Sequence, residues 1–150
     1  MDRQVVLVCG PPCAGKNTHV AARARPDDLV VDSDDLARRL GSPRRWHHED
    51  QYWQAAQEHW WQLAAAVGED PAARAWVIRC AASPAERQRV ADLVAATAVV
   101  VLVPPAAALM RRAAARPHRS RTRALIVRWL AEYRPRAGDQ VLTGEVLSCG

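Results

Sequence analysis

The chain has 150 residues, of which 49% are hydrophobic and 25% charged, and its formal net charge is +5. Length and composition are those of one globular domain, spanning residues 1–150, and they exclude disordered, collagen-like and coiled-coil chains. No apolar run reaches the roughly 18 residues that a membrane span requires. The apolar run before residue 10 is too short for a signal peptide. A cytoplasmic protein with no membrane segment is therefore expected.

Strands and helices alternate along the predicted chain. Short apolar runs rich in β-branched residues predict strands at 4–9, 29–31, 75–80 and 98–103, with an edge strand at 140–142. Helices are predicted at 16–24, at 34–40 behind a cap at Ser33 or Asp34, and at 49–67, 84–94, 105–112 and 123–133. This order predicts a three-layer α/β/α fold with a parallel sheet of four or five strands. Ligands of such folds bind at the carboxyl ends of the strands.

The segment after the first strand has the pattern of a phosphate-binding loop. Residues 10–16 match G-x-x-x-x-G-K and contain the only lysine of the chain, Lys16. Glycines allow successive N–H groups to face one anion, and the following helix adds its positive end. Asn17 stands where serine or threonine is usual, although Thr18 still offers a hydroxyl. The expected nucleotide-binding residues are Gly10, Pro11, Pro12, Cys13, Ala14, Gly15, Lys16, Asn17 and Thr18.

The loop sequence GPPCAGKNTHVA resembles the adenylate kinase loop, GPPxxGKGTxA, which also lacks a hydroxyl directly after the lysine. The rest of the chain, over residues 4–133, resembles the polynucleotide-kinase-like small P-loop kinases. It is similar to short P-loop proteins of actinobacteria and their phages that carry a DxDxLAxxLG signature, found here at residues 32–41. The resemblance implies the P-loop NTPase fold and an enzyme that uses ATP and Mg²⁺.

The second strand leads into the side of the site that would hold the phosphate acceptor. The resemblance implies that Asp34 is the base that accepts the proton of the attacking hydroxyl, and that Arg38, displaced by one position, contacts the acceptor. On the residues alone, capping of the next helix by Asp34 or Asp35 is the alternative. The third strand ends without a carboxylate. Asp32, with Thr18, is expected to hold the metal. Either Asp32 and Asp34 carry the metal shell through waters, or catalysis is weak.

Arginines concentrate in the last third of the chain. Nine lie between Arg111 and Arg136, with Glu132 as the only acid among them. The resemblance implies a short lid at about 112–122, where Arg112 and Arg116 flank the transferred phosphate, and their i, i+4 spacing puts both on one helix face. This patch predicts an anionic partner, either nucleotide phosphates or a polynucleotide, and a solvated helical surface is the alternative. The tail at 135–150 is otherwise unassigned.

Aromatic residues and histidines crowd the segment before and within the long helix. Trp53, Gln57, Trp60 and Ala64 share one face, which is the pattern of core packing. Trp46 and His47 precede this helix and are the candidates for stacking on an acceptor nucleotide. His47 and His48 lack the spacing of a zinc pair and are expected to be exposed or in contact with the acceptor. The four cysteines are expected to be reduced thiols.

Together these features predict a kinase that moves the γ-phosphate of ATP to a hydroxyl of a nucleic-acid 5′ end or of a nucleotide-like acceptor. A nucleoside monophosphate kinase is the alternative within enzymes. A nucleotide-binding, DNA-associated module with little turnover is the alternative outside them, in which the arginine patch would be the working surface.

Overall fold

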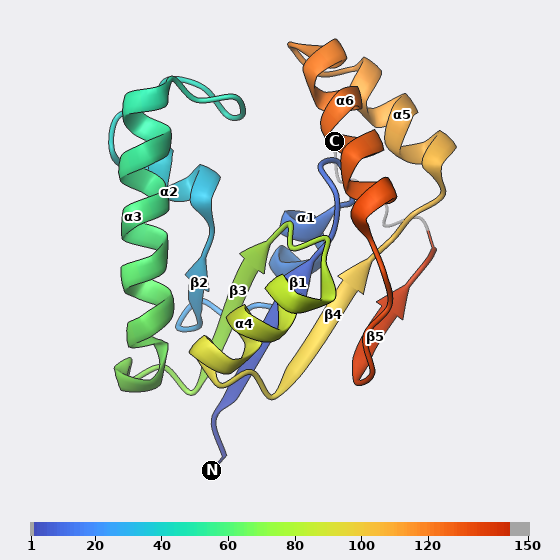
Figure 1. The fold of residues 1–150 in the computed structure, drawn as a ribbon. Coiled ribbons are helices and arrows are strands. Elements are labelled where there is room, and N and C mark those ends of the chain that lie inside the picture. Colours follow the sequence, from blue (N-terminus) through green and yellow to red (C-terminus); the bar gives the residue numbers. More distant parts are fainter. Residues whose placement is uncertain (1, 145–150) are drawn as a thin grey trace.

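The computed structural model describes residues 2–144, and five parallel strands form one sheet in the order β2-β3-β1-β4-β5 (Figure 1). The strands are β1 (Gln4–Cys9), β2 (Leu29–Val31), β3 (Arg74–Arg79), β4 (Ala98–Leu102) and β5 (Asp139–Leu142). Central strand β1 places Leu7 opposite Val77 of β3 and Val99 of β4. Because every strand runs the same way, all five carboxyl ends lie at one edge of the sheet.

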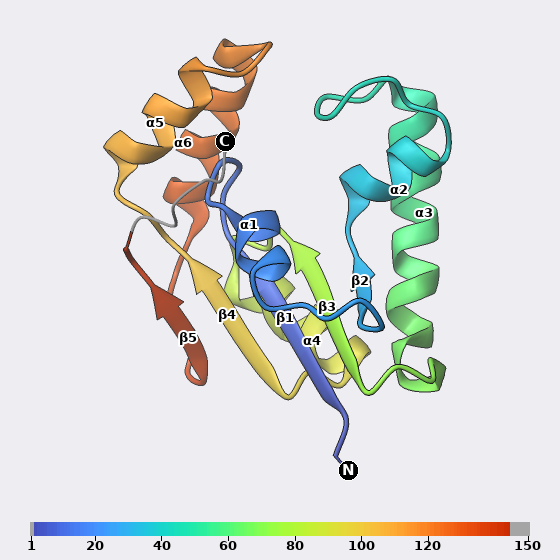
Figure 2. The same ribbon diagram turned by 180° about the vertical axis from the view of Figure 1, so that it is seen from behind.

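Helices cover both faces of the sheet. They are α1 (Lys16–Ala21), α2 (Ser33–Arg39), α3 (Asp50–Ala66) with the short 3-10 turn η1 (Val67–Glu69), α4 (Pro84–Val94), α5 (Ala106–Ala114) and α6 (Arg119–Glu132). Figures 1 and 2 show α4 on one face and α1 on the other, with α2 and α3 flanking β2 and the α5–α6 pair above β4 and β5. Within residues 2–144, no helix combines the length and apolar character that crossing a bilayer requires.

Alternate side chains of β1 pack into two separate hydrophobic cores, one on each face of the sheet. Leu7 packs in the cluster that contains Trp60 of α3 and Val90 of α4. Val8 packs in the opposite cluster, with Val20 of α1 and other apolar side chains of β3, β4 and α5. Period-two alternation in a strand buried on both sides produces this division. The predicted three-layer α/β/α architecture with an edge strand near the end of the chain is thereby confirmed.

Several helix ends differ from those predicted. Helix α1 stops at Ala21, before the predicted 24, because the N–H groups of Arg23 and Ala24 both bond to the carbonyl of Val20 and form a turn. Helices α5 and α6 are longer than predicted, so the expected lid at 112–122 is a helical hairpin whose connection is only residues 115–118. The tail prediction is described only as far as residue 144, and Cys149 lies outside the described residues.

The cap of α2 is Asp32, so the predicted cap at Ser33 or Asp34 is wrong. Asp32 is the last extended residue, with φ −138° and ψ 129°, and its carboxylate accepts a hydrogen bond from the N–H of Asp35 at 3.3 Å. Ser33 and Asp34 are already helical and cannot serve as cap. The side chain of Asp34 is therefore available for contacts with other elements.

Strand β5 is fastened to the fold by a buried ion pair. The fully buried Arg87 on α4 contacts Asp139 at 2.9 Å and also donates to the carbonyls of Ala81, Ala82 and Arg134. Asp139 receives a second hydrogen bond from Arg136 at 2.9 Å. The guanidinium thus links α4, the end of β3 and the start of β5.

Arg87→Met is expected to lower the free energy of unfolding by about 3–5 kcal/mol, because Asp139 would stay buried with one of its two cations removed. Urea denaturation followed by circular dichroism measures this change. Arg128→Met is the matched control, because Arg128 pairs with Glu132 on the exposed surface and its loss should shift the midpoint little. Equal shifts for both variants would contradict the assigned role of Arg87.

Candidate active site

The segment between β1 and α1 curls tightly at the carboxyl edge of the sheet. Gly10, Cys13 and Gly15 have φ values of 155°, 67° and 90°. A Cβ on Gly10 would lie 2.7 Å from the carbonyl oxygen of Leu102, so only glycine fits against the end of β4. Gly15 precedes α1, whose first turn has no side-chain cap. The main-chain N–H groups of this turn are thus left for a ligand at the helix start.

Lys16 lies within this curl. Its Nζ donates hydrogen bonds to the carbonyl oxygens of Gly10 and Pro11, both at 2.8 Å, and lies 3.8 Å from the Sγ of Cys80. The loop's own carbonyls therefore hold the ammonium group beside the N–H groups of the turn. An anion bound in the loop would meet a positive charge that is already in position.

Asp32 brings a buried carboxylate to the same edge of the sheet. Only 8% of Asp32 is exposed, and burial, together with the charge of Asp34, raises the pKa of its carboxyl group above 3.8. The side-chain amide of Asn17 donates to Asp32 at 3.5 Å, whereas no described contact joins the Thr18 hydroxyl to it. Asn17 is thus the loop residue that the structure brings to Asp32.

Crowded carboxylates of this kind fit a hard divalent cation, because such an ion takes oxygen ligands and offsets their mutual repulsion. Among residues 2–144, no group of three histidine, cysteine, aspartate or glutamate side chains is close enough to hold a metal alone. A magnesium ion at Asp32 would therefore need phosphate oxygens and waters for most of its ligands, which Mg²⁺ accepts readily.

Asp34 points from the first turn of α2 toward the segment between α2 and α3. Its Oδ1 lies 2.9 Å from the Nε2 of His48, and the Nδ1 of His48 lies 2.6 Å from the hydroxyl of Ser42. The His48 side chain is fully buried, so the prediction of an exposed or acceptor-contacting imidazole is wrong for this residue. Arg38 is exposed and contacts Asp35 at 3.8 Å, so the structure does not bring it to Asp34.

The segment between α2 and α3 extends toward the α5–α6 pair in both ribbon views (Figures 1 and 2), and side chains make the contacts between them. The guanidinium of Arg116 lies 4.1 Å from the ring centroid of Trp46, and the Nε2 of His47 lies 2.8 Å from the hydroxyl of Thr122. Burial, then the charge of Arg121, lowers the pKa of His47 below 6.5, so this imidazole is neutral at neutral pH. Trp46 and His47 thus connect the two sides of the site.

Two histidines at this bridge have unusual backbone conformations. His47 and His118 have φ values of 52° and 57°, and their rings meet edge to face with centroids 5.5 Å apart. Left-handed conformations are uncommon outside glycine, and they cluster at ligand sites and moving segments. Tertiary contacts therefore hold His47 and His118 in backbone conformations that their local sequence does not favour.

The two arginines predicted to flank a phosphate do lie beside the loop. Arg112 donates a hydrogen bond from Nη1 to the carbonyl of Cys13 at 2.9 Å. Burial raises the pKa of the Cys13 thiol, while the nearby positive charges of Arg116, Lys16 and Arg112 act in the opposite direction. Lys16 of α1, Arg112 of α5 and Arg116 of the 115–118 connection therefore surround one loop residue. Because α5 ends at Ala114, the prediction that Arg112 and Arg116 share one helix face is wrong. Further exposed arginines lie along α6, at Arg119, Arg121, Arg123 and Arg128.

The face of helix α3 that was predicted to pack in the core is only partly buried. Trp60 and Ala64 are buried, but Trp53 is 41% exposed and its ring stacks on His48, with centroids 6.1 Å apart. The buried face is completed by Ala56, one turn before Trp60. Trp53 therefore belongs to the wall of the site rather than to the core.

The end of β3 supplies a residue that the sequence analysis gave no role. Cys80 is exposed and lies next to Lys16, where a carboxylate was missing from the sequence. The preceding Arg79 turns away to α3, with its guanidinium 4.4 Å from the ring of Trp60 and bonded to Gln57. His48, the partner of Asp34, and Ser42, the partner of His48, were also missed, because isolated polar residues in an irregular segment carry no periodic signal.

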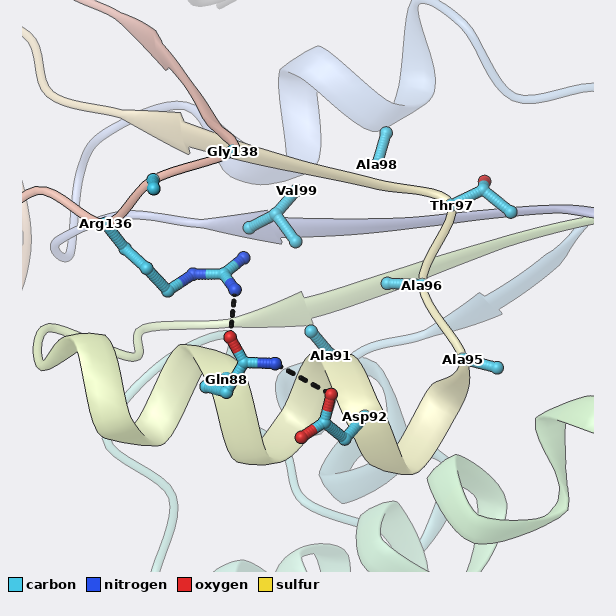
Figure 3. A pocket seen from close by; sticks show the side chains of 11 residues that line it. Gln88, Ala91, Asp92, Ala95, Ala96, Thr97, Ala98, Val99, Arg136 and Gly138 are labelled. Atoms are coloured by element: carbon cyan, nitrogen blue, oxygen red, sulfur yellow. Dashed lines mark hydrogen bonds between the residues drawn. The ribbon is translucent and has the colours of Figure 1, made fainter.

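A surface hollow at the other end of the sheet is a weaker candidate for ligand binding than this site. It lies between α4 and the starts of β4 and β5 (Figure 3). Its polar side chains bond to one another, since Arg136 donates to Gln88 and Gln88 donates to Asp92. The hollow therefore presents few unmet donors or acceptors to a ligand.

Comparison with known proteins agrees with this geometry. The chain matches the family described as "AAA domain" over residues 5–135, and it belongs to that family. No curated protein matches the sequence significantly.

Solved structures with a similar fold include kinases. One is a structure of the Pnkp1/Rnl/Hen1 RNA repair complex, with a TM-score of 0.65 and 13% identity over 87% of this chain and 45% of the other. Another is a gluconokinase from Sinorhizobium meliloti, with a TM-score of 0.61 and 15% identity over 93% and 82% of the two chains. A third is a sugar kinase from Janibacter, with a TM-score of 0.59 and 17% identity over 94% and 84%. The chain spans less than half of the matched repair protein. At these identities the comparison shows a shared α/β fold, which is that of P-loop NTPases.

Lys16→Ala is expected to abolish binding of Mg·ATP, because the positive charge inside the loop is lost, while the fold survives. Isothermal titration calorimetry measures the binding, and thermal melting checks the fold. Arg23→Ala, just after the same helix, is the control. Unchanged ATP affinity in Lys16→Ala would contradict the assignment of the loop.

Asp32→Asn is expected to raise the melting temperature at pH 7 without Mg²⁺. Because the fold raises the pKa of Asp32, the native state holds this proton more tightly than the unfolded chain, and its ionisation lowers stability as pH rises. Asparagine removes that penalty and still caps α2. The gain should shrink as pH falls toward 3.8.

The same variant should lose the stabilisation that Mg²⁺ with ATP gives the wild type. Asp35→Asn, which alters a half-buried carboxylate of the same helix that pairs with Arg38 and Arg39, is the control for both measurements. A melting temperature of Asp32→Asn that stays below wild type across the pH range would show that the carboxylate is not strained by burial.

Proposed function

We propose that the chain is an ATP-dependent kinase that transfers the γ-phosphate to a hydroxyl group. The observation that carries this proposal is the placement of one carboxylate, Asp34, opposite three cations around a single loop. Lys16 and Arg112 contact the loop directly, and the charge of Arg116 interacts with both Asp34 and Cys13. Phosphoryl transfer requires alignment, charge neutralisation and a proton acceptor, and little else from the protein.

In this proposal each group has a distinct task. Residues 10–18 bind the phosphates of ATP, and Lys16 reaches the β- and γ-phosphates. Arg112 and Arg116 stabilise negative charge on the transferring group, for which the planar guanidinium is suited. Asp32, with Asn17 beside it and Thr18 in the same turn, would hold Mg²⁺, which neutralises phosphate charge when bound.

Asp34 acts on the acceptor. The acceptor hydroxyl forms a bond to the γ-phosphorus while the bond from that phosphorus to the β–γ bridging oxygen breaks, and ADP leaves with the electron pair. The proton of the hydroxyl passes to the carboxylate of Asp34. Its side chain is 32% exposed, so an acceptor can reach it. Arg38 receives no support for its predicted contact with the acceptor.

We propose a nucleic-acid 5′ end or a nucleotide-like molecule as the acceptor. The exposed arginines of α6 extend the cationic surface beyond what a triphosphate alone needs, which supports a polyanionic acceptor. Trp46 and His47 stand at the bridge over the site, next to Arg116 and Thr122, where an acceptor base would stack. The similarity to short actinobacterial and phage proteins and the cytoplasmic location stay predictions.

The proposal is tested by transfer of labelled phosphate from ATP to a panel of 5′-hydroxyl oligonucleotides, nucleosides and nucleoside monophosphates. Transfer to 5′-hydroxyl ends is expected to be the fastest. Transfer only to monophosphates would identify a monophosphate kinase, and salt-sensitive DNA binding without any transfer would identify a binding module.

Asp34→Asn is expected to keep ATP affinity and to lower the transfer rate by about 10²–10⁴, the usual contribution of a general base. Asp35→Asn is the matched control, because its side chain pairs with Arg38 and Arg39 on the exposed face of α2. Undiminished turnover of Asp34→Asn, or an equal loss in both variants, would place the base elsewhere.

A further inference from the structure

A hydrogen-bonded chain of side chains ends on the carboxylate proposed as the base. Oδ1 of Asp34 is bonded to His48, whereas Oδ2 accepts no hydrogen bond from residues 2–144. The two oxygens of one carboxylate thus have different surroundings. The oxygen that would receive a proton is Oδ2, and the direction of its lone pairs depends on how firmly Oδ1 is held.

The carboxylate of Asp34 determines the direction of the protons along this chain. A carboxylate only accepts hydrogen bonds, so the Nε2 of His48 carries the hydrogen that joins it to Asp34. The hydroxyl of Ser42 lies 2.6 Å from the Nδ1 of His48 and also accepts a hydrogen bond from the N–H of Arg44 at 3.3 Å. Ser42, His48 and Asp34 thus form one continuous series of hydrogen bonds that ends on Oδ1 of Asp34.

His48 is itself held from three sides. Its side chain is fully buried, and the ring of Trp53 stacks on it with an interplanar angle of 8°. The N–H of Ser42 bonds to the carbonyl of Ala37 at 3.0 Å, which ties the start of the chain to α2. Ring plane, tautomer and distance to Asp34 are therefore all set by packed neighbours, as in sites where outer contacts orient a reactive group.

We propose that His48 is a positioning residue, which donates from Nε2 to Oδ1 of Asp34 and so aims Oδ2 at the acceptor hydroxyl. This inference rests on the proposed function, in which Asp34 is the base. His48 touches no reacting atom in this arrangement. Its effect is to hold a carboxylate that would otherwise rotate on a half-exposed side chain.

The competing interpretation is that His48 only anchors the segment that carries Trp46 and His47. Two substitutions separate these roles. His48→Phe keeps a ring on Trp53 but removes both hydrogen bonds, whereas His48→Gln can still donate from its Nε2 to Asp34. If His48 positions the base, His48→Phe should lower kcat by about 10–100-fold with the KM for ATP unchanged. His48→Gln should recover most of that loss, and an equal loss in both variants would overturn the proposal.

A double-mutant cycle gives a readout that an anchoring role would not change. Because His48 acts through Asp34, His48→Phe should cause no further loss of kcat once Asp34→Asn is present. Additive losses, or a loss that falls on the KM for both substrates, would overturn the proposal. Thermal melting of each variant shows whether the fold is retained.

Nitrogen-15 NMR of the histidine side chains in the intact protein tests the contact without any turnover. Hydrogen on Nε2 is expected, with its signal assigned by its loss in His48→Gln and shifted in Asp34→Ala. Hydrogen on Nδ1 alone, or a signal indifferent to Asp34→Ala, would overturn the proposal. If the wild type transfers phosphate to no acceptor, the proposed function fails, and the NMR result still decides whether His48 holds Asp34.

Discussion

The backbone between β1 and α1 must reverse direction within six residues while it keeps its N–H groups on one side. Gly10 makes this possible because its missing side chain lets the loop lie directly on the last carbonyl of β4. Cys13 and Gly15 then take left-handed conformations that complete the curl. Lys16 is held where it is by carbonyls that only this path presents. The role assigned to every other candidate residue depends on where that residue lies relative to this loop.

Charges of opposite sign are separated across the site. Carboxylates come from the β2 side, where Asp32 ends the strand and Asp34 begins α2, and cations come from α1 and α5. The separation follows from topology, because β2 and β4 lie on opposite sides of β1 and deliver their following helices to opposite walls. A phosphate between the walls would face cations from one direction and a proton acceptor from the other. This polarity supports transfer rather than binding alone.

Sequence patterns predicted the features of the fold that depend on interactions between neighbouring residues. The loop and the strands could be predicted from the sequence, because glycine spacing and β-branched runs act over a few neighbours. Tertiary contacts decided the rest. The order of strands depends on pairing between segments up to about 90 residues apart, such as Val6 with Ala98. The burial of His48 depends on Trp53 and Ser42, and no spacing rule connects those three residues to Asp34.

The buried pair between Arg87 and Asp139 bears on how the chain matures during synthesis on the ribosome. Arg87 is translated long before Asp139, and until then its guanidinium has the carbonyls of Ala81 and Ala82 but no counter-charge, which is unfavourable in a buried position. The sheet built from β1 to β4 would therefore stay loosely packed around α4 until residue 139 emerges. Docking of the final strand then supplies the counter-charge, so β5 is expected to consolidate the packing around α4.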